Sequence, residues 1–530
     1  MDKILNRRLQ AFSRDGRHAG LGGIRRGIEK ESLRITPDGK LAQTPHPSAL
    51  GSALTHPFIT TDFSEALLEF ITPPCDSIHA ALGWLEDIHR FTCQQLHNQG
   101  ELLWAASMPC ILGNDADIPV GQYGSSNVAQ MKTIYRVGLG HRYGRLMQTI
   151  SGIHYNFSLP EMFWQAYAEV EGYASSLPLQ DFITARYFDL IRNFRRHVWL
   201  LIYLFGAAPA VCPTFVRGRE HHLQRLEPGS LYLPYATSLR MGNLGYQSSA
   251  QSELVIDYNN LNGYVQTLLK GLMTPHPPYE AIGLKGEEGW RQLSTSILQI
   301  ENEFYSTIRP KRVTESGETP IHALHQRGVE YIEVRCVDVN PFQPLGIDSE
   351  QAHFIEVFLL HCLFSDSPST DADEYCALYG NQHAVVDRGR DPSLKLFCHG
   401  GFHALRDWGS KLIEEMLPVA RLLDEAMACD TYSRAVVNQR DVIAGNRLAP
   451  AAEMLEKMQK QNISFYQLAR SQSDQHHAYF QGELPADRRE QFEAVARQSR
   501  LDQQTREQQD KESFEAYLQD YYRQYSALLQ

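Results

Sequence analysis

The chain has 530 residues, a formal net charge of −12 and a pI near 6.0. This acidic balance argues against a nucleic-acid partner or an anionic membrane surface, because both need a dominant basic surface. The nine cysteines are scattered and form no Cys-x-x-Cys pair, so neither a disulfide framework nor a zinc ribbon is indicated, and a reducing cytoplasm is favoured. Residues 1–8 lack the apolar core of a signal peptide.

Residues 3–15 have the spacing of a short amphipathic helix, and residues 27–35 have the pattern of a strand that carries Glu29 and Glu31. Side chains two apart in a strand point to the same face, so these carboxylates lie about 6–7 Å apart along the backbone. At about 5 Å such a pair repels by roughly 3 kcal/mol, so both stay ionised only with water, a cation or a basic side chain between them. A turn signal at residues 37–40 predicts a hairpin after this strand.

Three further segments have the pattern of strands with polar side chains on one face. These side chains are Glu69 in residues 66–71, His154 and Asn156 in residues 151–157, and Glu333 and Arg335 in residues 331–335. Each segment alone is compatible with a solvated sheet face. Because Glu69 sits inside an apolar run, free solvation is less expected there, and the four strands together predict a shared acidic face.

Helical spacing predicts a core helix over residues 77–99, a helix around residues 131–139 and a long buried helix over residues 181–205. The uncharged stretch 198–216 is long enough to be weighed as a membrane span. Gly206, Pro209 and Pro213 divide it, however, so we expect a buried helix end followed by a turn or strand. The irregular region 218–250 suits a loop that covers substrate, and a helix is expected over residues 258–271.

The alternation of residues 298–305 predicts another strand, followed directly by the three cations Arg309, Lys311 and Arg312. Such a cluster can clamp a polyphosphate, and a solvated basic turn explains it equally well. From about residue 350 helical periodicity dominates, over residues 351–364 and 411–427 and in a tail at 487–530 that we expect to form a helix pair. We predict a catalytic region over residues 1–390 and a helical C-terminal region over residues 391–530.

Glutamates and one histidine without cysteine favour a hard divalent ion, magnesium or manganese, over zinc. Divalent ions on an acidic face opposite a basic clamp are what phosphoryl transfer requires. The sequence contains no Gly-x-x-x-x-Gly-Lys-[Ser/Thr] motif, which excludes a P-loop nucleotide site. The patterns alone therefore predict a metal-dependent phosphate enzyme.

Six segments together resemble the glutamate–cysteine ligases of bacterial type 1. They are residues 26–34, 60–73, 147–157, 234–240, 308–312 and 331–335. The resemblance implies an α+β protein with a glutamine-synthetase-like catalytic fold, in which helices surround a curved, mainly antiparallel sheet. It further implies an ATP- and magnesium-dependent ligation of the γ-carboxylate of L-glutamate to the amine of L-cysteine through a γ-glutamyl phosphate, the first step of glutathione biosynthesis. A cytoplasmic monomer with small-molecule substrates, and without a nucleic-acid or membrane partner, is expected.

The resemblance also implies roles for individual residues. Metal ligands would be Glu29, Glu31, Glu69, His154 and Glu333; catalytic residues Arg240 and Arg335; nucleotide-binding residues Arg309, Lys311 and Arg312; and substrate-binding residues Phe63, Tyr135, Gln148, Thr149, Ile150, Arg240, Tyr246, Tyr305 and Arg335. Within the last set, Phe63, Tyr135, Tyr246 and Tyr305 would line the cysteine pocket.

Two alternatives stay open at the level of the sequence. A hydrolase of phosphate esters could use the same carboxylate-bound metals, and would release phosphate from simple esters. A catalytically silent binding protein could carry an acidic face that is purely structural. Release of ADP that needs both glutamate and cysteine separates the ligase from both alternatives.

Overall fold

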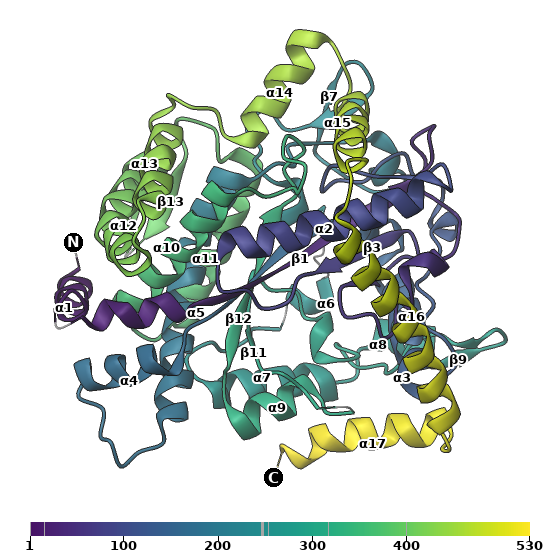
Figure 1. Cartoon of the computed structure of the whole chain (residues 1–530), viewed down its shortest axis with the longest axis horizontal. Helices are drawn as coiled ribbons and strands as arrows, with labels where there is room; N and C mark the ends of the chain where they lie inside the picture. The colour runs from purple at the N-terminus through teal and green to yellow at the C-terminus, as the bar shows by residue number, and fades with distance from the viewer. Residues whose placement is uncertain are drawn as a thin grey trace.

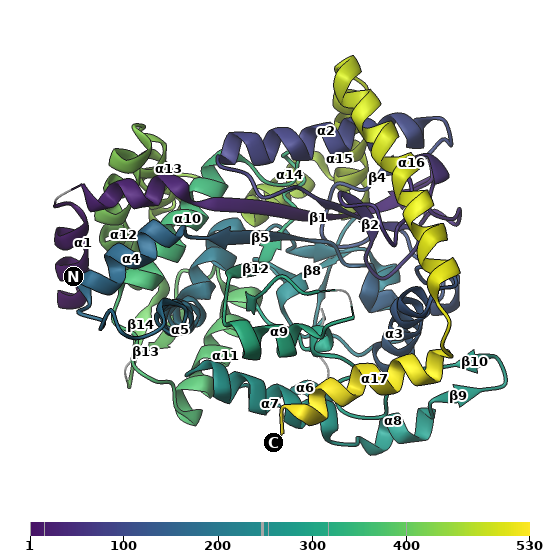
Figure 2. The same ribbon diagram turned by 60° about the horizontal axis from the view of Figure 1, so that its bottom comes forward.

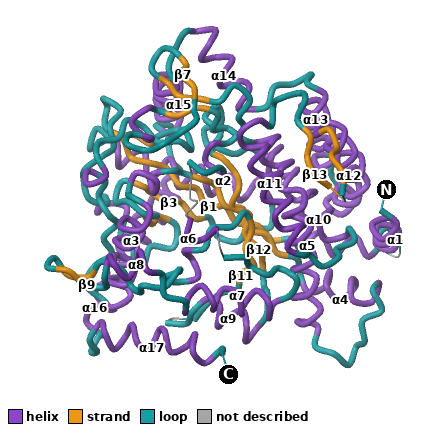
Figure 3. Tube along the Cα trace, turned by 180° about the vertical axis from the view of Figure 1, so that it is seen from behind, coloured by secondary structure: helices purple, strands orange, loops and turns teal. Residues whose placement is uncertain are grey.

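The computed structural model describes residues 2–14, 16–244, 249–252, 254–315, 317–398 and 400–529. A seven-stranded antiparallel sheet runs through the middle of the molecule, with helices around it (Figures 1 and 3). Its strands follow the order β11-β12-β5-β1-β3-β2, and β4 pairs with β1 off this path. They are β1 (Arg25–Ile35), β2 (Ile59–Thr61), β3 (Leu67–Ile71), β4 (Leu102–Leu103), β5 (Gly152–Ser158), β11 (Ile308–Lys311) and β12 (Tyr331–Asp338).

Short strands outside this sheet form small antiparallel pairings: β6 (Ala210–Val211) with β8 (Ser230–Tyr232), β8 with β7 (Gln224–Leu226), β9 (Lys285–Gly286) with β10 (Gly289–Trp290), and β13 (Lys395–Cys398) with β14 (Gly401–Ala404). The helices are α1 (Lys3–Phe12), α2 (Ile78–His97), α3 (Asn127–Tyr143), α4 (Glu161–Val170), α5 (Leu179–Phe205), α6 (Ser249–Ser252), α7 (Leu261–Met273), α8 (Pro277–Ile282), α9 (Pro320–Arg327), α10 (Ser349–Phe364), α11 (Ala372–Arg388), α12 (Leu405–Met427), α13 (Thr431–Ala444), α14 (Pro450–Gln461), α15 (Phe465–Phe480), α16 (Ala486–Gln509) and α17 (Phe514–Ala527). This mixture confirms the expected α+β class.

One face of the sheet is buried under helices. Ile28, Phe70, Tyr155 and Val334, from four different strands, belong to one hydrophobic core with side chains of α2, α5 and α10. Helix α2 lies along β1 (Figure 2). Since strand side chains alternate, burial of these residues turns their neighbours in sequence to the opposite face. The packing of one face thereby fixes which residues form the other.

Helix α5 confirms the predicted buried helix over residues 181–205 and ends at Gly206. The uncharged stretch then continues into β6, as expected from its glycine and prolines. Among the described residues, no helix combines the length and apolarity that a membrane crossing requires. Helices α16 and α17 confirm the predicted helix pair of the tail, which runs along one side of the molecule to the C-terminus (Figure 2).

The predicted strand over residues 298–305 is wrong, because this segment contains a 3-10 turn at Glu301–Glu303. The alternation of polar and apolar residues in this segment does not mark a solvent-facing side of a strand. Glu301 and Glu303 are instead buried by specific hydrogen-bond partners. The basic residues Arg309 and Lys311 lie within strand β11 itself instead of following a strand. Pro310 is tolerated there because β11 is the edge strand of the sheet. Helix α11 lies within residues 365–401, where the sequence predicted no element.

The predicted division near residue 390 remains a prediction. The largest hydrophobic core contains residues from both sides of it, including Phe358 of α10 and Leu423 of α12. Towards the other end of the molecule, Tyr522 of α17 donates a hydrogen bond to the carbonyl of Gln299, at 2.8 Å. The C-terminal helices therefore contact both the core and the segment that precedes β11.

Candidate active site

The open face of the sheet carries the side chains that strand alternation predicted. Register pairs Glu29 with His154, Glu31 with Glu69, and Glu333 with Asn156 across neighbouring strands. These side chains point away from the face that packs on α2, α5 and α10, so the predicted common face is confirmed. We call Glu29, Glu31, Glu69, His154 and Glu333 the acidic face.

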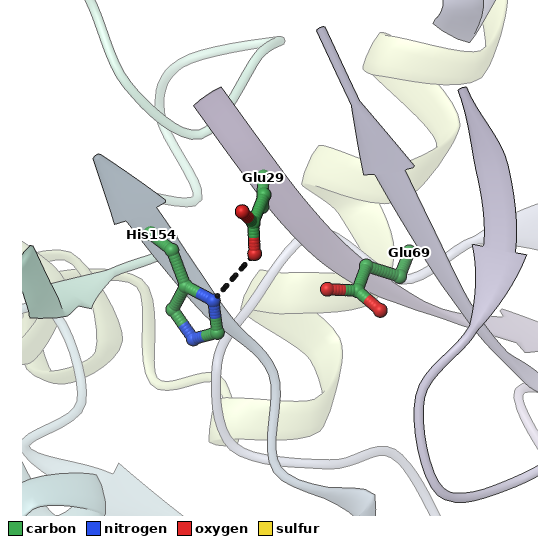
Figure 4. A group of neighbouring side chains, drawn as sticks. All are labelled: Glu29, Glu69 and His154. Atoms are coloured by element: carbon green, nitrogen blue, oxygen red, sulfur yellow. Dashed lines mark hydrogen bonds and ion pairs between the residues drawn. The ribbon is translucent and has the colours of Figure 1, made fainter. Parts of the chain in front are cut away.

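His154 lies in the centre of the acidic face. Its Nδ1 is 3.1 Å from Glu29 Oε2 and 3.6 Å from Glu333 Oε1, and its Nε2 is 3.9 Å from Glu31 Oε1. Glu29, Glu69 and His154 each offer one ligand atom, and these three atoms lie within 4.8 Å of one another (Figure 4). Three separate strands thus bring two carboxylates and one imidazole together at one point.

The glutamates of the acidic face fall into two pairs, one with raised and one with lowered pKa values. Burial, together with Glu29 and Asp62, raises the pKa of Glu69 to about 8, and burial with Asp62 and Glu69 raises the pKa of Glu31. Burial also opposes ionisation of Glu29 and Glu333. For Glu29 the contact with His154 more than offsets the effect of burial, and for Glu333 the nearby Arg335 and Lys311 do so. Both pKa values are therefore lowered. The sheet therefore holds a carboxylate cluster that is not fully neutralised by its own cations.

The donor set fits a hard divalent ion such as magnesium or manganese. Carboxylate oxygens dominate it, one imidazole completes it, and no thiol takes part. Asn156, which pairs with Glu333, has a buried amide Oδ1 that lacks a hydrogen-bond partner within the described part of the chain. An unsatisfied buried oxygen beside a carboxylate cluster is the feature that a bound cation would satisfy.

The three cationic side chains predicted to bind nucleotide, at residues 309–312, make different contacts. Lys311 Nζ is 3.3 Å from Glu333 Oε2, at the margin of the acidic face. The Arg309 guanidinium donates to the carbonyls of Asn302 and Phe304. Arg312 follows the end of β11, donates to the carbonyl of Arg327 at 2.8 Å and contacts groups outside the acidic face. Its nucleotide-binding role stays a prediction.

A pocket opens directly over the acidic face, and we call it the central pocket. Its lining residues are Glu31, Asp62, Phe63, Tyr135, Arg136, Leu139, Tyr143, Gln148, His154, Arg240, Gln251, Asn302, Glu303, Tyr305, Arg309 and Arg335. Of the predicted substrate-binding residues, six belong to this set: Phe63, Tyr135, Gln148, Arg240, Tyr305 and Arg335.

Two other predicted substrate-binding residues have structural partners instead. The Thr149 hydroxyl donates to the carbonyl of Leu146 at 2.7 Å, and Ile150 packs in a hydrophobic core, so neither side chain lines the pocket. Tyr246 lies outside the described residues. The substrate-binding roles of all three therefore stay predictions.

Two arginines enter the central pocket from different elements. Arg335 Nη1 is 3.1 Å from Glu333 Oε1, and its buried Nε lacks a hydrogen-bond partner among the described residues. Arg240 is held by Asp338, which accepts from its Nε at 2.7 Å. Gly152 allows this approach, since a Cβ there would lie 2.8 Å from Arg240 Nη1. Both guanidinium groups are thus fixed where an anionic substrate can reach them.

Sequence reasoning missed several residues of this site. Asn156 was placed on the correct strand face by alternation, although it received no role. Asp62, Arg136, Tyr143, Gln251, Asn302 and Glu303 also line the pocket. They come from α3, α6 and loops, where no periodicity marks a side chain as facing a pocket, so only the tertiary structure could bring them to this place.

The profile of the family described as Glutamate-cysteine ligase matches residues 9–385. The ligase of Alcanivorax borkumensis is 50% identical over 98% of this chain and 99% of its own length. That of Saccharophagus degradans is 52% identical, over 95% of both chains. The chain belongs to the glutamate–cysteine ligase family.

Solved structures extend the likeness to three dimensions. The crystal structure of the glutamate–cysteine ligase of Francisella tularensis, in complex with AMP, has a TM-score of 0.89 and 38% identity, over 96% of this chain and 99% of that one. A bifunctional glutathione synthetase of Pasteurella multocida has a TM-score of 0.68 and 26% identity, over 89% of this chain and 55% of that one. The glutamate–cysteine ligase fold thus includes the C-terminal helices of this chain as well as its sheet.

Proposed function

We propose that this protein is an ATP-dependent ligase that joins the γ-carboxylate of L-glutamate to the amine of L-cysteine. The observation that carries the proposal is the convergence of Glu29, Glu69 and His154 on one point beneath a pocket that contains Arg240 and Arg335. Membership of the glutamate–cysteine ligase family supports the choice of amino acids, and the AMP complex of the Francisella relative supports the nucleotide. The product would be γ-glutamylcysteine, formed in the first step of glutathione biosynthesis.

Magnesium, or manganese in its place, is the ion that we assign to the acidic face. Glu29, Glu31, Glu69, His154 and Glu333 would together hold such ions, and the Asn156 oxygen, which has no partner among the described residues, adds a further donor. A divalent ion supplies neutralisation of the phosphate oxygens of ATP. The raised pKa values of Glu69 and Glu31 support this assignment, because these carboxylates lack sufficient positive charge from the protein alone.

The arginines would act on the reacting groups. A γ-carboxylate is a poor electrophile, so it first takes the γ-phosphoryl group of ATP, which yields γ-glutamyl phosphate and ADP. Arg335, whose Nε has no partner in the described part of the chain, would hold the transferring phosphoryl group, and Arg240 would hold the glutamate. Lys311 beside Glu333 would contribute charge to the ATP phosphates, with Arg309 and Arg312 as further candidates.

In the second step the cysteine amine attacks the activated carbonyl. The C–N bond forms, the C–O bond to phosphate breaks, and the amine loses a proton as the amide is made. Phe63, Tyr135 and Tyr305 line the pocket with apolar ring surface and would enclose the cysteine side chain. Exclusion of water by this enclosure protects the acyl phosphate from hydrolysis.

We also propose that the protein is a cytoplasmic monomer that acts on small molecules and has no nucleic-acid or membrane partner. All nine cysteines are free in the structure, which fits a reducing compartment. The net charge of −12 fits the absence of a polyanionic partner.

One assay tests the proposal against both alternatives. ADP formation should require glutamate, cysteine and a divalent ion together, and mass spectrometry should find γ-glutamylcysteine. Phosphate release from p-nitrophenyl phosphate without ATP would favour an ester hydrolase. Binding of ATP and metal without any turnover would favour a silent binding protein.

A further inference from the structure

One wall of the central pocket is a short turn whose shape depends on buried polar contacts. A 3-10 turn at Glu301–Glu303 and the two residues after it lead towards strand β11, and Asn302, Glu303 and Tyr305 of this segment line the pocket. A 3-10 turn of three residues has little internal hydrogen bonding of its own. Its position must therefore be set by contacts with other elements.

The Glu303 carboxylate supplies the strongest of these contacts. Its Oε1 accepts from Arg142 Nη1 at 2.9 Å and from the Tyr143 hydroxyl at 2.5 Å, and its Oε2 accepts from the backbone N–H of Gln299 at 2.6 Å. The side chains of Arg142 and Glu303 are fully buried. Charge-assisted hydrogen bonds in such a setting are stronger than neutral ones and rigid in geometry.

The partners of Glu303 are themselves fixed. Arg142, near the end of α3, also donates to Gln292 Oε1 at 3.0 Å and to the Ser294 carbonyl at 2.6 Å. Burial and the nearby Glu303 carboxylate raise the pKa of Tyr143, so its hydroxyl remains a donor. Helix α3 is thereby bound to the whole segment that leads into the turn.

Gln251 of α6 holds the backbone of the same turn. Its side-chain Nε2 donates to the Glu303 carbonyl at 2.9 Å and to the Tyr143 hydroxyl at 3.2 Å, while its Oε1 accepts from the Tyr305 N–H at 3.2 Å. Arg309 donates to two further carbonyls of the turn. The contacts of Glu303 and Gln251 thus fix the backbone at Tyr305, whose hydroxyl also donates to Met241 Sδ at 3.1 Å.

Glu303 is unsuited to bind substrate directly. Both carboxylate oxygens are occupied by protein donors, and the side chain has no exposed surface, so only the backbone of Glu303 is accessible at the pocket. It also lies outside the group of ligand atoms formed by Glu29, Glu69 and His154. A role in metal binding or phosphoryl transfer is therefore not available to it.

We propose that Glu303, through its bonds to Arg142 and Tyr143, is a positioning residue that fixes Tyr305 in the wall of the pocket and so sets the affinity for the amine substrate. This inference rests on the proposed function, in which Tyr305 encloses the cysteine. Because the network acts on the wall and not on the acidic face, its loss changes cysteine binding more than phosphoryl transfer.

Steady-state kinetics of Glu303→Gln and Tyr143→Phe tests the inference. The first change removes the charge at constant shape, and the second removes one hydroxyl and is the milder variant should the first fail to fold. We expect KM for cysteine to rise about tenfold or more, as for the loss of a hydrogen bond to a charged group. KM for glutamate and for ATP, and kcat at saturating cysteine, should stay within about twofold.

Tyr432→Phe is the matched control. The Tyr432 hydroxyl also donates to a buried carboxylate, that of Glu356 at 2.8 Å, but on the helix-covered side of the sheet. Its kinetic constants should match those of the parent protein although its melting temperature falls. Unchanged KM for cysteine in the test variants, or an equal rise in all three KM values, would overturn the positioning role. Absence of cysteine-dependent turnover in the parent protein would instead overturn the proposed function, and this inference with it.

Discussion

Glu31 of β1 and Glu69 of β3 stand directly opposite each other in the antiparallel ladder. Like charges in this position destabilise a sheet, since the two side chains are near neighbours on one face. Ionisation of both carboxyls is unfavourable in the folded protein, because burial and neighbouring acids raise the pKa of each. We propose that the facing carboxylates are retained despite this cost because they bind the divalent ion that we assign to the acidic face.

Metal binding should release protons at neutral pH. With a pKa of about 8, Glu69 holds its proton for most of the time at pH 7 in the metal-free protein, and a ligand must be ionised. We expect calorimetric titration with Mg²⁺ in buffers of different ionisation enthalpy to show release of at least one proton at pH 7, from Glu69 and from Glu31, whose pKa is also raised, and the Glu69 share should fall towards zero above about pH 9. In Glu69→Gln this release should be smaller, and metal binding without proton release in the parent protein would contradict the assignment.

The contribution of Glu69 to the stability of the metal-free protein should fall as pH rises. The unfolded chain ionises a glutamate near the ordinary value of 4.5, whereas the folded chain keeps Glu69 protonated up to about 8. Since the raised folded pKa favours the protonated fold, the Glu69 contribution is complete at low pH and is lost between these two values. Melting curves measured with a chelator should show this loss as a difference between the parent protein and Glu69→Gln, and saturating Mg²⁺ should reduce it. A difference in melting temperature that stays constant over this range would argue against the raised pKa.

Glu69→Gln should have opposite effects on stability and on activity. The amide is neutral at every pH, so folding at neutral pH no longer has to protonate a carboxylate buried beside Glu29 and Asp62, and the metal-free variant is expected to be about 1 kcal/mol more stable than the parent. It also removes a metal ligand, so ligation should fall by two orders of magnitude or more. Glu29→Gln should likewise keep the fold and lose turnover. Near-normal turnover in either variant would count against the metal site.

Arg335→Lys tests whether geometry matters beyond charge. Lysine keeps the positive charge but lacks the planar fork, whose Nη1 contacts Glu333 and whose Nε meets no partner among the residues that the structure describes. We expect kcat/KM to fall about a hundredfold, which corresponds to about 2.7 kcal/mol. Arg327→Lys, at a surface ion pair with Glu318, serves as the control and should leave kcat/KM unchanged. An unaltered rate in Arg335→Lys would exclude a bidentate role.

On the opposite side of the sheet, a buried ion pair should affect the stability of the protein and not its activity. Glu356 is fully buried and accepts from Arg26 at 2.8 Å and from the hydroxyls of Tyr155 and Tyr432. Glu356→Ala leaves the Arg26 guanidinium without its partner, and we expect a loss of about 3–5 kcal/mol in the free energy of unfolding. The double variant Arg26→Met, Glu356→Leu should recover much of this loss, measured by chemical denaturation. Equal destabilisation in both would show that packing, not charge, dominates.

Much of this site could be predicted because strand alternation is a local rule. Once Ile28, Phe70 and Val334 are recognised as core residues, the acids beside them must share the other face. The same rule failed at Glu301 and Glu303. These two acids have the spacing of a strand face, but they lie in a turn and are buried by contacts with Tyr525 and Arg142. No local pattern marks Gln251 as part of the pocket wall, because its place depends on contacts far apart in the sequence.

The most direct test of the account is diffraction from crystals soaked with Mn²⁺ and a non-hydrolysable ATP analogue. Anomalous maps should place manganese within about 2.0–2.3 Å of oxygens of Glu29 and Glu69 and of a nitrogen of His154. The analogue's phosphates should lie on the same ions, beside Arg335. Manganese bound only elsewhere, or these three side chains unliganded at saturating metal, would contradict the central claim that separate strands together bind divalent ions for phosphoryl transfer.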